Sequence, residues 1–158
     1  MPAFTALIHA DAGAAHLARL LETVRAADEV VVVDHLHDDA TRKVAHQYGA
    51  RLVHAVAGVQ PGAYAVDCRH DWVLCLQASE SFGEALEAAL LEWKRAAPQP
   101  GDAFAIAIRE QQQGEWRMLE PETRLVNRTC VNWQGKLPPS VGSATTLGGF
   151  LLRFPEPA

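Results

Sequence analysis

Histidines and carboxylates alternate in one short segment of the chain. Residues 34–39 read DHLHDD, so two imidazoles, His35 and His37, stand among three aspartates. In an extended segment alternate side chains point to the same side, and two histidines with a carboxylate can hold a metal ion. No third ligand follows at a typical metal-binding spacing, and a solvated polar loop is the more common role of such a segment. We therefore favour the loop over the metal site.

A second polar cluster follows an apolar segment. Residues 71–80 read DWVLCLQASE, in which the run 72–76 is typical of a buried strand and is followed by Gln77, Ser79 and Glu80. Strands that end in this way often deliver carboxylates to a metal ion and a phosphate. Here an amide and a hydroxyl precede a single carboxylate. That carboxylate could instead lie at the start of a helix, where the helix dipole favours an acidic residue.

The first part of the chain alternates between strand and helix patterns. Strands are expected at short apolar runs, namely 4–9, 29–33, 51–54 and 72–76. The intervals between these strands predict four helices. The first follows Asp11 as a cap, and the second spans 41–48 after a cap at Asp38 or Asp39. The third spans 61–68, and the fourth follows a capping box of Ser81 and Glu84. This alternation predicts an α/β domain with a mainly parallel sheet between helices, and a site at the strand ends.

Helical periodicity disappears after Ala97. The segment PQPGD is typical of a turn, and the remaining apolar runs predict short strands at 103–108, after QQQGEW, at 122–128, at 130–133 and at 148–154. We therefore expect one domain over 1–158, with an α/β half at 1–97 and a short strand-rich half at 98–158 that forms an antiparallel C-terminal extension.

Composition narrows the classes of protein. The chain has 158 residues, 49% of them hydrophobic, and a net charge of -5. No basic cluster could follow a phosphate backbone, so nucleic acid is not an expected partner. No basic leader and no run long enough for a bilayer is present, so we expect a cytoplasmic protein. Three widely spaced cysteines suit reduced thiols better than disulfides or zinc.

The order of these segments resembles that of family 2 glycosyltransferases, whose nucleotide-binding half is a Rossmann-like sheet of the GT-A type. The resemblance covers nearly the whole chain. It lies in IHADAG, in VVVDHLHDDAT beside the family's V-D-S-G-S-T-D-G-T, in HQYGARLVH, in WVLCLQASE beside a strand ending in D-x-D-E, and in RLVNRTCVNWQG beside R-L-F-R and W-x-G. The small enzymes that add sugars to lipopolysaccharide cores are the most similar subgroup.

The resemblance implies a three-layer GT-A domain that binds a nucleotide sugar linked to UDP or GDP. Asp34, Asp11 and Asp39 fall on its nucleotide-binding positions. An aspartate that closes the second strand can accept hydrogen bonds from the ribose or base, or it can instead cap the loop at the strand end. Asp39 also fits the cap of the helix from Thr41. Half 1–97 would then bind the nucleotide and half 98–158 the acceptor.

The chain departs from the family where the chemistry is done. The D-x-D motif would hold Mg²⁺ or Mn²⁺ in an active protein, but Gln77 and Ser79 replace both aspartates, and Glu80 alone remains. The segment 136–140, KLPPS, holds no carboxylate or histidine at the place of the family's general base. No catalytic residue is assigned. Two hypotheses stay open: a transferase with weak or lost activity, and a noncatalytic binding or assembly module. A homo-oligomer or partner chain would complete the acceptor surface.

Overall fold

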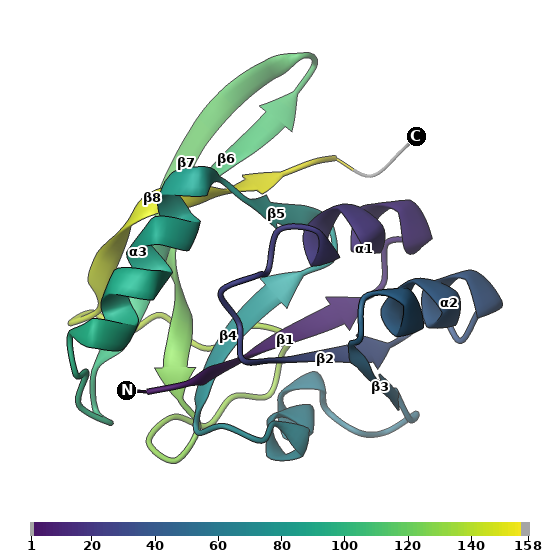
Figure 1. Cartoon of the computed structure of the whole chain (residues 1–158), viewed down its shortest axis with the longest axis horizontal. Helices are drawn as coiled ribbons and strands as arrows, with labels where there is room; N and C mark the ends of the chain where they lie inside the picture. Colours follow the sequence, from purple (N-terminus) through teal and green to yellow (C-terminus); the bar gives the residue numbers. More distant parts are fainter. Residues whose placement is uncertain (1, 156–158) are drawn as a thin grey trace.

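A computed structural model describes residues 2–155 of the chain and places eight strands in one sheet (Figure 1). The strand order is β3-β2-β1-β4-β7-β6-β8-β5. The elements along the chain are β1 (Phe4–Ala10), α1 (Ala14–Leu21), β2 (Glu29–Asp34), α2 (Asp39–Gln47), β3 (Arg51–His54), the 3₁₀ helix η1 (Pro61–Asp67), β4 (Trp72–Gln77), β5 (Glu80–Phe82), α3 (Glu84–Arg95), β6 (Ala103–Gln112), β7 (Glu115–Asn127) and β8 (Thr145–Arg153).

The first half of the sheet is parallel, as the alternation of strands and helices predicts. β1 pairs in parallel with β2 and β4, and β2 pairs in parallel with β3. Because β1 and β2 are covered on both faces, the middle of β2 is apolar, and Val31, Val32 and Val33 are fully buried. The carboxyl ends of all four strands therefore lie at one edge.

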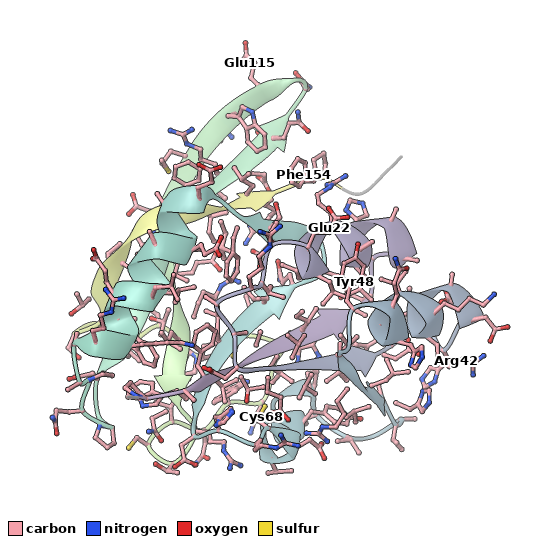
Figure 2. The ribbon with its side chains drawn as sticks, in the orientation of Figure 1. Glu22, Arg42, Tyr48, Cys68, Glu115 and Phe154 are labelled. Carbon is pink, nitrogen blue, oxygen red and sulfur yellow. The ribbon has the colours of Figure 1, made fainter. Side chains whose placement is uncertain are left out.

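Two apolar clusters cover the two faces of this half. On one face, α1 and α3 place Leu17, Leu20, Leu86 and Leu90 against Phe4 and Ile8 of β1. On the other face, η1 packs Tyr64 and Ala65 against Leu7 and Val31, with Cys68 (Figure 2) in the same cluster. Alternate residues of β1 thus serve opposite faces.

The helices α1 and α2 lie side by side in Figure 1. The Tyr48 hydroxyl at the end of α2 donates a hydrogen bond of 2.9 Å to Glu22 at the end of α1, and Figure 2 labels both residues. None of the helices within residues 2–155 combines the length and apolar character that crossing a membrane requires.

The second half of the sheet is mixed. β7 continues the sheet antiparallel to β4, β6 pairs antiparallel with β7, and β8 pairs in parallel with β6. The tip of the β6–β7 hairpin, which carries Glu115, projects from the body of the protein (Figures 1 and 2). The expected strand at 130–133 is wrong, since this segment belongs to the irregular connection from β7 to β8.

Two helix starts differ from the sequence predictions. Gly13, rather than Asp11, precedes α1, and no side chain caps that helix. The capping box of Ser81 and Glu84 is also wrong, because residues 80–82 pair with β8 as the strand β5 and α3 begins after Gly83. Ser81 lies opposite Leu152, about seventy residues later, and local spacing carries no information about such a pairing.

Candidate functional site

The polar residues singled out in the sequence lie along the carboxyl edge of the parallel strands. Asp34 closes β2, and its register partners are Ala10 on β1 and His54 on β3. Gln77 closes β4 opposite His9 of β1. In open α/β sheets this edge is the usual place of a ligand.

Asp34 is buried, with an exposed fraction of only 1%. Its Oδ1 accepts hydrogen bonds from the backbone N–H groups of Leu36 and His37, at 3.0 and 2.9 Å. Its Oδ2 is buried and has no hydrogen-bond partner among the described residues. One oxygen therefore shapes the loop after β2, while the other remains free to accept from a ligand.

A histidine pair lies beside this aspartate. His9 Nδ1 and His35 Nε2 are 2.8 Å apart, and His9 is fully buried. Burial, together with the nearby His35 and Lys136 and against an opposing effect of Asp11, lowers the pKa of His9 to about 4. Burial, followed by Lys136, also lowers the pKa of His35. Both rings are thus neutral at pH 7, and one can donate the shared hydrogen bond to the other.

Lys136 reaches the same edge from the connection between β7 and β8. Its ammonium forms an ion pair with Asp11, and both side chains are about one-third exposed, at 36% and 35%. The preceding residues dock on η1, where the Gly62 N–H donates to the Gln134 carbonyl at 3.0 Å. A Cβ at Gly62 would lie 1.9 Å from the carbonyl oxygen of Trp133, so only glycine permits this approach.

Glu80 does not serve as an acid at a helix start, as the sequence suggested, because it lies fully buried in β5. Its two oxygens accept hydrogen bonds of 2.7 Å each from Arg124, which is itself fully buried, and Arg153 donates to Oε2 at 3.1 Å. Burial alone would raise the pKa of Glu80, but the hydrogen bonds and charge of Arg124 more than offset it and hold that pKa below its usual value.

Residues 77–80 do not fit a hard divalent cation. Gln77 and Ser79 supply no charge, and the backbone N–H of Gln77 donates to Glu80 Oε1 at 2.8 Å. The only carboxylate of the segment is already paired with two arginines. Mg²⁺ and Mn²⁺ favour charged carboxylate oxygens, and none in this segment is free. Glu80 therefore stabilises the fold rather than binding a metal ion.

Asp39 lies outside the buried part of the edge. It is 77% exposed and forms an ion pair with Arg42, which Figure 2 shows at the outer surface of α2. The cap of α2 is Asp38, whose Oδ1 accepts from the Thr41 N–H at 2.7 Å, so of the two expected caps Asp38 is confirmed and Asp39 is wrong.

Three residues of this edge were not assigned a role from the sequence, namely His9, His54 and Lys136. Aligning the ends of the predicted parallel strands would have placed His54 beside Asp34 and His9 beside Gln77. No comparable signal exists for Lys136, because its position depends on how an irregular segment docks.

No protein-family model and no curated protein sequence matches the chain. Solved structures do. TarS of S. aureus aligns with 97% of this chain at a TM-score of 0.66 and 12% identity, and the alignment spans 37% of that structure. The structure of TarS 1-349 aligns with 96% of this chain at a TM-score of 0.66 and 12% identity, and the alignment spans 60% of that structure.

A third structure, mannosyl-3-phosphoglycerate synthase from Rubrobacter xylanophilus, aligns with 71% of the chain at a TM-score of 0.53 and 19% identity, over 42% of its own length. The chain thus spans less than two thirds of each of these structures. At such identities the similarity concerns the fold. The chain shares a GT-A-like α/β fold with these structures.

Proposed function

We propose that this domain binds a nucleoside diphosphate sugar, linked to UDP or GDP, at the carboxyl edge of β1, β2 and β4. The single observation that carries the proposal is the free, buried Oδ2 of Asp34. A ribose hydroxyl or a base N–H can donate to it, and the ligand then compensates the cost of burying this oxygen. We assign Asp11, which follows β1, and Asp39, at the start of α2, to the same ligand as more exposed contacts.

Lys136 is suited to the diphosphate. Its ammonium is held at the edge by Asp11 and stays about one-third exposed. A lysine neutralises phosphate as a point charge, which a cation at 77–80 cannot do here.

We further propose that sugar transfer is weak or lost, in a relative of the small lipopolysaccharide-core enzymes. The neutral residues Gln77 and Ser79 and the arginine-bound Glu80 support this reading, because the leaving diphosphate would lack a metal ion. The segment 136–140 supplies no carboxylate as a base. A noncatalytic binding module in which residues 98–158 contact the acceptor or a partner is the second candidate, favoured by the same residues.

Calorimetric titration with UDP and with GDP, each with and without Mn²⁺, tests nucleotide binding. We expect one of them to bind with an affinity that Mn²⁺ leaves unchanged. Asp34→Ala should abolish binding, and Lys136→Ala should weaken the diphosphate at least tenfold while leaving the nucleoside unaffected. Asp71→Ala is the matched control, because Asp71 precedes β4 at the opposite edge.

If neither UDP nor GDP binds at millimolar concentration, the proposed function is refuted. Binding that requires Mn²⁺, together with release of UDP or GDP from a nucleotide sugar, would instead establish an active transferase and contradict the loss of activity.

A further inference from the structure

Three polar side chains meet where β2 and β3 end. Asp34, His37 and His54 each offer one ligand atom, and these atoms all lie within 4.8 Å of one another. Asp34 Oδ2 and His54 Nδ1 are 3.7 Å apart, and the rings of His37 and His54 stack with centroids 5.6 Å apart and planes inclined by 16°. Two strands and the loop after β2 therefore converge on one point.

The backbone of the loop brings His37 to this point. His37 has φ 56°, in the left-handed region that few residues other than glycine adopt and in which histidine is enriched. The N–H groups of Leu36 and His37 both donate to Asp34 Oδ1, which holds the loop folded back over the strand end. Left-handed backbone at a residue that is not glycine costs free energy and tends to occur at binding sites.

Asp34 Oδ2 points into the cluster without a protein partner. Asp34 is 1% exposed, and among residues 2–155 no group donates a hydrogen bond to this oxygen. The separation of 3.7 Å from His54 Nδ1 is longer than a hydrogen bond. A buried carboxylate oxygen without a partner is costly, and a cation placed among the three side chains would remove that cost.

The donor set selects the kind of cation. Two imidazoles and one carboxylate form a ligand set that is typical of Zn²⁺ and similar transition metals, and a fourth coordination position stays open to water. Mg²⁺ and Mn²⁺ prefer oxygen ligands. Zinc ligands lie about 3.3 Å apart for bonds of about 2.0–2.1 Å, so the cluster must contract. The exposed side chains of His37 and His54 can rotate to achieve this.

We propose that Asp34, His37 and His54 form a binding site for Zn²⁺ or a similar transition-metal ion. The site is separate from residues 77–80. It also differs from the pairing of His35 with His37 considered from the sequence, because the ring of His35 bonds His9 and His54 takes its place. It shares Asp34 with the proposed nucleotide site but requires no nucleotide.

Zinc titration of the untagged full chain by calorimetry tests this site, in a Cys130→Ser background that removes the exposed thiol as a competing ligand. We expect one Zn²⁺ per chain, with binding at least tenfold weaker in His37→Ala and in His54→Ala and lost in the double variant. His46→Ala is the matched control, an exposed histidine of α2 outside the cluster. Co²⁺ should give the visible absorption of a site with nitrogen and oxygen ligands.

Equal zinc affinity in the double variant and the parent, no zinc binding at all, or displacement of zinc by equimolar Mg²⁺ would each overturn the site. Nucleotide titrations run in EDTA keep the two ideas apart. If zinc fails to bind while UDP or GDP binds in EDTA, the metal site alone is refuted. If zinc binds while both nucleotides fail, the proposed function alone is refuted.

Discussion

Two buried carboxylates at strand ends have opposite surroundings in this protein. Glu80 in β5 is paired with Arg124 and Arg153, and each of its oxygens accepts a short hydrogen bond. Asp34 at the end of β2 uses one oxygen for its own loop and leaves the other without a partner among the described residues. A buried charge that the protein itself satisfies serves the fold. One that the protein leaves unsatisfied is a candidate for binding.

Of the variants considered, Glu80→Gln should lower the free energy of unfolding most. It leaves Arg124 buried with the half-exposed Glu122 as its remaining carboxylate, at 3.0 Å. We expect the free energy of unfolding to fall by about 3–5 kcal/mol, measured by urea denaturation. The double variant Glu80→Leu/Arg124→Met should recover most of that loss, since it removes both charges. A loss below about 1 kcal/mol for Glu80→Gln would show that the pair is not structural.

Low pH should act next most strongly, through the histidine that lies between the two regions. The pKa of His9 is about 4 in the folded protein and 6.5 in the unfolded chain. As pH falls from 6.5, His9 of the unfolded chain takes up a proton that His9 of the folded protein does not. The contribution of neutral His9 to the free energy of unfolding is therefore complete above pH 6.5 and is lost as the pH falls to 4. The loss should reach about 3 kcal/mol.

The comparison of parent and variant isolates this histidine. His9→Asn should flatten the fall in unfolding free energy between pH 6.5 and 4, whereas His46→Asn on the surface of α2 should retain it. Because the pKa of Glu80 is lowered, its own contribution is lost only at lower pH, below its usual 4.5. An unchanged slope in His9→Asn would contradict the neutral buried state of His9.

The cap of α2 gives a smaller effect and a matched pair of aspartates. Asp38→Ala should lower the free energy of unfolding by about 1 kcal/mol, because the Thr41 N–H loses its acceptor. Asp39→Ala removes only an exposed ion pair and should change stability by less than about 0.5 kcal/mol. Equal losses in urea denaturation would show that the two residues share the cap.

Asp34→Asn should affect stability least. The amide oxygen can still accept from Leu36 and His37, and no protein group loses a charge partner at hydrogen-bonding distance. We expect the free energy of unfolding to change by less than about 0.5 kcal/mol or to rise, while ligand binding is lost. A loss as large as that of Glu80→Gln would remove the distinction between the two carboxylates.

Much of the fold could be predicted from local patterns. The runs FTALIH, EVVVV and WVLCL became β1, β2 and β4, because uninterrupted apolar and β-branched segments suit strands covered on both faces. The change of character after Ala97 also matches the mixed half of the sheet. β5 was missed because three residues without a strong pattern form a strand only when β8 is beside them.

The sequence by itself determined the α/β class, the parallel direction of the first strands and the position of Asp34 at a strand end, since these follow from patterns within short segments. Only the tertiary structure decided which partner each polar group has. Glu80 with Arg124, His9 with His35, and Asp11 with Lys136 are separated by 26 to 125 residues. Such pairings depend on strand register and on the docking of distant segments, which local spacing does not encode.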